Sequence, residues 1–111
     1  MNNIGIDLVY IPEFQRRVGQ NGGVEMVFTA SELAQNQKVE SLAGIFAAKE
    51  ASMKALGKKI DWHEVWIEKA ASGQPFLASL ALAPNQRASV SISHDGDYAI
   101  AIVLVCNDFP G

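Results

Sequence analysis

The hydrophobic positions of residues 44–57 predict the central helix of the fold. Apolar side chains recur there at three- and four-residue steps, at Leu42, Ile45, Phe46, Met53 and Leu56. Four alanines raise the helix propensity, and Gly57 is a typical helix end. Lys49 falls inside the apolar arc and Glu50 lies at its border. An unpaired buried charge is costly, so Lys49 requires a partner.

Alternation of apolar and polar residues predicts strands on both sides of this helix. In residues 3–9, Ile4, Ile6 and Leu8 point to one side, and Gly5, Asp7 and Val9 to the other. Further strands are predicted at residues 65–68, 76–80, 89–94 and 98–105. Asp95-Gly96 predicts a hairpin between the last two. Residues 98–105 are almost entirely apolar, which favours a central and well-covered strand.

Two shorter helices are predicted before the central one. Pro12 suits the first turn of a helix that carries Phe14 and Val18 on its apolar side. Thr29 and Glu32 have the spacing of a capping box, which predicts a helix from residue 30 to about 37. The expected fold class is therefore α+β, with helices packed on an antiparallel sheet.

Length, composition and net charge favour a single globular domain that neither spans a membrane nor binds nucleic acid non-specifically. A chain of 111 residues with 49% hydrophobic residues predicts one globular domain over residues 1–111. No apolar run is long enough to span a membrane. The N-terminal residues lack a signal-like segment, which favours a cytoplasmic protein. The net charge of −3 argues against non-specific nucleic-acid binding, which requires a basic surface.

Two carboxylates, Asp7 and Glu50, lie at positions that the hydrophobic pattern does not explain. Aspartate is disfavoured inside a strand, yet Asp7 interrupts an apolar pattern that continues to Val9. Two hard oxygen ligands with open positions suit Mg²⁺ together with substrate phosphates, which indicates phosphoryl chemistry. Structural explanations stay open: Asp7 as a strand end, Glu50–Lys54 as an i, i+4 surface pair, and His94 as an ordinary strand-end residue.

Three segments resemble the holo-acyl-carrier-protein synthase family of phosphopantetheinyl transferases. Gly5-Ile-Asp7 is similar to the N-terminal strand of that family. Phe46-Ala-Ala-Lys-Glu-Ala51 with Lys54-Ala-Leu-Gly57 is similar to its signature helix. Ser91-Ile-Ser-His94, followed by Tyr98, is similar to its C-terminal hairpin. The segments occur in the family's order and span nearly the whole chain.

The resemblance implies an enzyme that moves phosphopantetheine from coenzyme A to a serine of an apo acyl carrier protein, releasing adenosine 3′,5′-bisphosphate. By position, Asp7 and Glu50 are the implied Mg²⁺ ligands, and Glu50 and Lys54 the implied catalytic residues. Lys49, Lys54 and His94 are the implied coenzyme A-binding residues. Glu50 or a water on the metal would take the serine proton. Family members of this length are typically homotrimers with active sites between subunits.

Two other hypotheses remain at this point. Ile45 and Glu13 stand where the family usually carries arginine, which motivates a non-catalytic coenzyme A-binding or assembly subunit that keeps the fold. An unrelated α+β interaction module, in which Glu50 and Lys54 form only a surface pair, is the third. Binding of coenzyme A and Mg²⁺ distinguishes these hypotheses.

Overall fold

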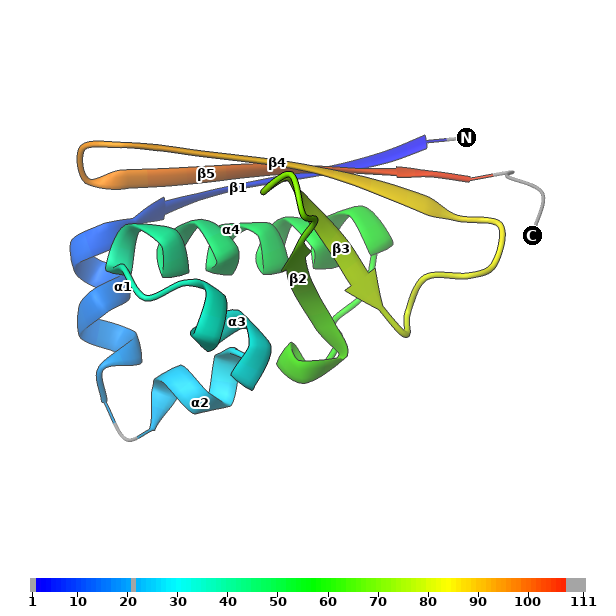
Figure 1. Cartoon of the computed structure of the whole chain (residues 1–111). Helices are drawn as coiled ribbons and strands as arrows, with labels where there is room; N and C mark the ends of the chain where they lie inside the picture. Colours follow the sequence, from blue (N-terminus) through cyan, green and yellow to red (C-terminus); the bar gives the residue numbers. More distant parts are fainter. Residues whose placement is uncertain (1, 21, 108–111) are drawn as a thin grey trace.

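The computed structural model describes residues 2–20 and 22–107, and its elements agree closely with the hydrophobic pattern (Figure 1). In chain order they are β1 (Asn2–Tyr10), α1 (Ile11–Val18), α2 (Gly23–Val27), α3 (Ala30–Gln35), α4 (Val39–Leu56), a 3₁₀ turn η1 (Trp62–Glu64), β2 (Val65–Lys69), β3 (Pro75–Ser79), β4 (Arg87–Asp95) and β5 (Tyr98–Cys106). The predicted α+β class, with helices on an antiparallel sheet, is confirmed.

Strands β1, β5 and β4 form an antiparallel sheet in that order, and β2 and β3 form a separate hairpin. The hairpin predicted at Asp95-Gly96 joins β4 to β5, with Gly96 at φ 57°. Strand β5 is central, as its apolar sequence predicts. Its register with β1 pairs Asp7 with Ala101 and Ile6 with Ile102.

Helix α4 lies along one face of this sheet, and small residues allow the close approach (Figure 1). Its alanines at 43, 47, 48, 51 and 55 are all buried. A Cβ on Gly5 would collide with the carbonyl oxygen of Ala51. The backbone of α4 therefore occupies the space that the missing side chain of Gly5 leaves, and this contact brings β1 against the helix.

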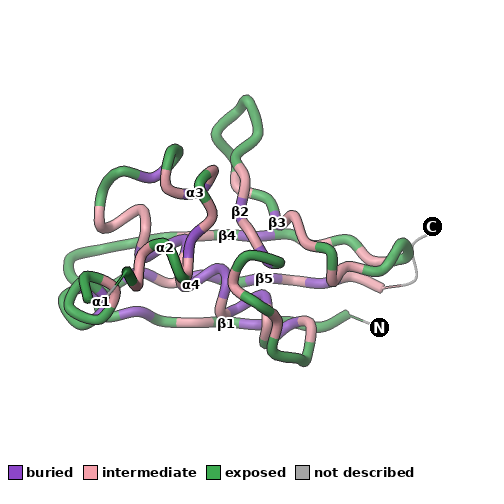
Figure 2. Tube along the Cα trace, turned by 90° about the horizontal axis from the view of Figure 1, so that it is seen from below, coloured by how far each residue is buried: buried purple, intermediate pink, exposed green. Residues whose placement is uncertain are grey.

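The opposite side of α4 is covered by α1, α3 and the β2–β3 hairpin, so the helix is buried between two layers (Figures 1 and 2). The capping box predicted at Thr29 and Glu32 is present in both directions. Phe14 packs against Phe28 and Phe46, which joins α1 to α4. This packing explains why α4 has buried residues on several sides.

The outer face of the three-stranded sheet is apolar and open. Exposed side chains on this face include Ile4, Ile6 and Leu8 of β1, and Tyr98 and Ile102 of β5. The prediction that residues 98–105 are well covered holds for only one face of the strand in the single chain, because no other described element packs on the outer side (Figure 1). Among the described residues, no helix is both long and apolar enough to cross a membrane.

Candidate active site

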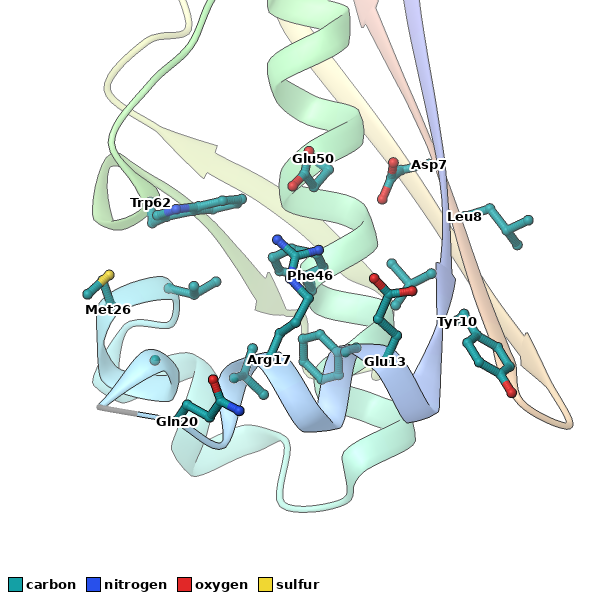
Figure 3. A pocket seen from close by; sticks show the side chains of 15 residues that line it. Asp7, Leu8, Tyr10, Glu13, Arg17, Gln20, Met26, Phe46, Glu50 and Trp62 are labelled. Carbon is teal, nitrogen blue, oxygen red and sulfur yellow. The ribbon is translucent and has the colours of Figure 1, made fainter.

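A pocket of about 620 Å³ opens between β1, α1, α2 and α4 (Figure 3). Asp7 of β1 and Glu50 of α4 both line it, together with Arg17 of α1. Phe46 and Trp62 form an aromatic part of the wall, with stacked rings whose centroids lie 5.4 Å apart and whose planes are inclined by 28°. The pocket therefore combines two carboxylates, one guanidinium and an apolar surface.

Asp7 and Glu50 reach the pocket from elements far apart in sequence. Asp7 shares a strand face with Gly5 and Val9, so its side chain points toward α4. Burial raises the pKa of Glu50, and the nearby negative charge of Asp7 raises it further. A partly buried carboxylate beside a second one is a suitable place for a cation.

The described residues supply two acidic groups at this position and no larger cluster. Across residues 2–20 and 22–107, no group of three or more His, Cys, Asp or Glu side chains is arranged to hold a metal ion. A site with two carboxylates would need further oxygen ligands from water or substrate, which is the usual coordination of Mg²⁺ beside phosphates.

Lys54 lies at the rim of this carboxylate pair. Its Nζ donates to the carbonyl oxygen of Ile6 at 2.8 Å and lies 3.2 Å from Oδ1 of Asp7. The i, i+4 pair that the sequence allowed with Glu50 is not among the ion pairs of the described residues. Lys54 instead crosses from α4 to β1, because the close approach at Gly5 brings that strand within reach.

Lys49 is fully buried on another side of α4. Its Nζ donates to Oε1 of Glu32 at 2.6 Å, and both side chains are 0% exposed. Glu32 also accepts the backbone N–H groups of Thr29 and Ile67, so it joins α3, α4 and β2. The partner that a buried lysine requires is thus Glu32. A direct contact between Lys49 and coenzyme A would require the side chain to leave that partner.

His94 lies outside the pocket of the single chain. It is an exposed residue of β4, paired in register with Ala99, and β4 is the sheet edge opposite β1. The central strand β5 therefore separates His94 from Asp7. The structure brings Asp7, Glu50 and Lys54 together, and it leaves Lys49 and His94 apart from them.

Several pocket residues were missed or undervalued by the sequence analysis. Trp62 stacks on Phe46 across 16 positions of chain, and no local pattern predicts that contact. Glu13 and Arg17 line the pocket from α1, although neither was among the predicted site residues. Ile45, where the resembling family carries arginine, is 2% exposed and belongs to the core.

Comparison with known proteins supports the resemblance across the chain. Residues 3–103 match the family model described as ACPS, the 4′-phosphopantetheinyl transferase superfamily. A protein of Chlorobaculum parvum named holo-[acyl-carrier-protein] synthase is 39% identical, over 92% of this chain and 96% of that protein. A protein of the same name from Sulfurovum sp. is 33% identical, over 92% of this chain and 94% of its own length.

Solved structures agree with these sequence matches. The Chronobacterium ammoniagenes ACPS–CoA complex is similar with a TM-score of 0.84 and 30% identity, over 96% of this chain and 98% of that chain. The Helicobacter pylori holo-[acyl-carrier-protein] synthase in complex with coenzyme A has a TM-score of 0.81 and 33% identity, over 93% and 99%. The chain therefore belongs to the 4′-phosphopantetheinyl transferase superfamily. Within that superfamily it is an enzyme of the holo-[acyl-carrier-protein] synthase family.

Proposed function

We propose that this enzyme transfers 4′-phosphopantetheine from coenzyme A to a serine of an apo acyl carrier protein and releases adenosine 3′,5′-bisphosphate. The observation that carries this proposal is the meeting of Asp7 and Glu50 in one pocket, with the ammonium of Lys54 at its rim. The names of the relatives and the coenzyme A complexes of similar chains support the substrate pair.

The proposed cofactor is Mg²⁺, held by Asp7 and Glu50. The donor set fits this ion because both ligands are hard oxygens and because Glu50, whose pKa is raised, has no hydrogen-bond or ion-pair partner among the described residues. When bound, such an ion neutralises charge on the pyrophosphate and orients the reacting groups. The remaining positions of the ion are left to water and substrate oxygens.

The chain's own residues then bind, orient and move a proton. The serine oxygen forms a new bond to the phosphorus that carries the pantetheine arm, and the bond from that phosphorus to the oxygen bridging to the nucleotide phosphate breaks. The electron pair leaves with adenosine 3′,5′-bisphosphate. Lys54 would neutralise phosphate charge. The proton of the serine would pass to Glu50 or to a water.

Two of the predicted ligand-binding residues receive different proposed roles. Lys49 supports the site from behind through Glu32, since its ammonium is enclosed in the core. His94 would contact the nucleotide from a neighbouring subunit, because β5 separates it from the pocket of its own chain. The basic residues Arg16 and Arg17 of α1 would face an acidic carrier protein at the mouth of the pocket.

The proposed assembly is a homotrimer that covers the outer face of the sheet. Ile4, Ile6 and Leu8 are 67%, 51% and 61% exposed, and an exposed apolar surface of this kind marks an interface. Sedimentation analysis is expected to give three times the mass of one chain. Ile6→Lys is expected to dissociate the assembly, since a charge would be buried between subunits.

Intact-mass spectrometry of apo carrier proteins, incubated with the enzyme, coenzyme A and Mg²⁺, tests the reaction. The expected result is a mass gain of one phosphopantetheine that disappears when Mg²⁺ is chelated. Asp7→Asn and Glu50→Gln are expected to abolish the gain while keeping the fold. No gain on any carrier, with coenzyme A binding still detectable by calorimetry, would favour the non-catalytic subunit. The cytoplasmic location and the single domain over residues 1–111 stay predictions.

A further inference from the structure

Lys54 contacts two oxygens of strand β1, one on the backbone of Ile6 and one on the side chain of Asp7. Its Nζ donates to the carbonyl oxygen of Ile6 at 2.8 Å and lies 3.2 Å from Oδ1 of Asp7. The Lys54 side chain is 55% exposed, whereas that of Asp7 is 18% exposed. The ammonium therefore lies on the solvent side of a partly buried carboxylate, in a contact that water can replace.

Glu50 lies on the same helix as Lys54 but does not pair with it. It precedes Lys54 by one turn of α4 and lines the pocket with Asp7 (Figure 3). No hydrogen bond or ion pair of Glu50 is found within residues 2–20 and 22–107, in contrast to Asp7. Of these two neighbouring carboxylates, only Asp7 on β1 is in contact with the ammonium of Lys54.

We propose that Lys54 competes with the divalent cation for Asp7, so that the ammonium must leave this carboxylate when the metal binds. The inference rests on the proposed metal site at Asp7 and Glu50. Two cations on one carboxylate repel each other, and an exposed ion pair is weak enough to be exchanged. The released side chain is then free to meet a phosphate oxygen of the substrate.

This arrangement couples the two ligands of the enzyme. A phosphate that draws Lys54 away from Asp7 opens the carboxylate for the metal, and a metal on Asp7 frees Lys54 for the phosphate. Because coupling between two binding events is reciprocal, each ligand strengthens the other through this one side chain. Removing the ammonium therefore has opposite expected effects: tighter binding of the metal alone and loss of the phosphate contact.

A second lysine provides a control for charge alone. Lys59 lies beyond the end of α4, and its charge lowers the pKa of Glu50, so it acts on the same site through space. No contact between Lys59 and Asp7 or Glu50 is found in the described part of the chain. Lys59→Met removes a nearby positive charge without removing a contacting one, whereas Lys54→Arg keeps both the charge and the ability to pair with Asp7.

The test is a titration of the 111-residue chain with Mn²⁺ in the absence of coenzyme A. Electron paramagnetic resonance measures the concentration of free Mn²⁺ and therefore how much is bound. Lys54→Met is expected to bind Mn²⁺ up to about fivefold more tightly than wild type, the factor that an exposed ion pair supplies. Lys54→Arg is expected to match wild type, and Lys59→Met to show a smaller gain than Lys54→Met. Circular dichroism checks that each variant is folded.

The outcomes separate this inference from the metal site on which it rests. Equal or weaker Mn²⁺ binding by Lys54→Met, or an equal gain in Lys59→Met, overturns the competition. If wild type binds Mn²⁺ and Asp7→Asn does not, the metal site stands in either case. If no variant binds Mn²⁺ at saturating concentrations, the site and the competition are both overturned.

Discussion

Helix α4 carries two lysine–carboxylate pairs, five residues apart, in opposite environments. Lys49 and Glu32 meet at 2.6 Å with both side chains fully buried. Lys54 and Asp7 meet at 3.2 Å, and the lysine of this pair is more than half exposed. The same chemical pair therefore occurs once in the core and once at the rim of the pocket.

The difference assigns the two pairs to different tasks. In the core, removing one partner leaves the other as an uncompensated charge, so the Lys49–Glu32 pair is tied to the fold. At the rim, water solvates either partner when the pair opens, so the Lys54–Asp7 pair can exchange with ligands. Burial, and not the type of residue, therefore distinguishes the lysine that is tied to the fold from the lysine that we propose contacts the substrate.

Breaking the buried pair is expected to have the largest effect. Lys49→Met should lower the free energy of unfolding by about 3–5 kcal/mol, because it leaves the carboxylate of Glu32 buried without its cation. Denaturant titration measures this loss. The double variant Glu32→Gln with Lys49→Met should recover part of it, since no buried charge remains. A single variant as stable as wild type would contradict the assigned role.

The exposed pair can also be disturbed without touching either partner. Gly5→Ala places a methyl group against the backbone of α4 at Ala51, so β1 must move away from the helix. The expected loss is about 1–3 kcal/mol in the free energy of unfolding, together with weaker Mn²⁺ binding as Asp7 moves away from Glu50. Ile4→Ala, on the outer face of β1, is the control and should leave Mn²⁺ binding unchanged.

Removing the rim lysine is expected to change stability much less. Lys54→Met should alter the free energy of unfolding by about 0–1 kcal/mol, as is usual for exposed ion pairs. The difference from wild type should shrink further in 1 M salt, where charges are screened within about 3 Å. Denaturant titration at two salt concentrations measures both effects. A loss as large as that of Lys49→Met would remove the distinction between the two pairs.

The smallest effect on stability is expected from replacing Glu50, which lies between Lys49 and Lys54 in sequence. Burial and Asp7 raise the pKa of Glu50, so the folded chain keeps this proton to a higher pH than the unfolded chain. Stability from Glu50 is therefore present at low pH and is lost as pH rises through the folded-state pKa. Without divalent metal, Glu50→Gln should be slightly more stable than wild type at pH 7.

Thermal unfolding of wild type and Glu50→Gln, measured with a chelator from pH 4 to pH 8, tests this pH dependence. The difference should disappear below the ordinary pKa of a glutamate, about 4.3. A difference that does not vary with pH, or a variant less stable at neutral pH, would show that the ionised carboxylate does not destabilise the chain.

Two residues of the signature segments could be singled out from the sequence because they interrupt the hydrophobic periodicity. Asp7 interrupts an alternating strand, and Lys49 interrupts the apolar arc of a helix, so both positions could be identified as needing a partner. The pattern could not say which partner each one would find. Glu32 lies 17 residues before Lys49, and Asp7 lies 47 residues before Lys54. The position of Trp62 over Phe46 was beyond prediction for the same reason.

By itself, the sequence determined most elements of this protein, although not α2 or η1: the 3.6-residue period of α4, the two-residue period of the strands, the Thr29–Glu32 cap and the Asp95-Gly96 hairpin. These depend on interactions within a few residues, which local chemistry decides. Only the tertiary structure decided which lysine is buried, which carboxylate each one meets, and that the apolar outer face of the sheet stays open in the single chain. Periodicity defines the faces of an element, but packing between distant elements decides which faces meet.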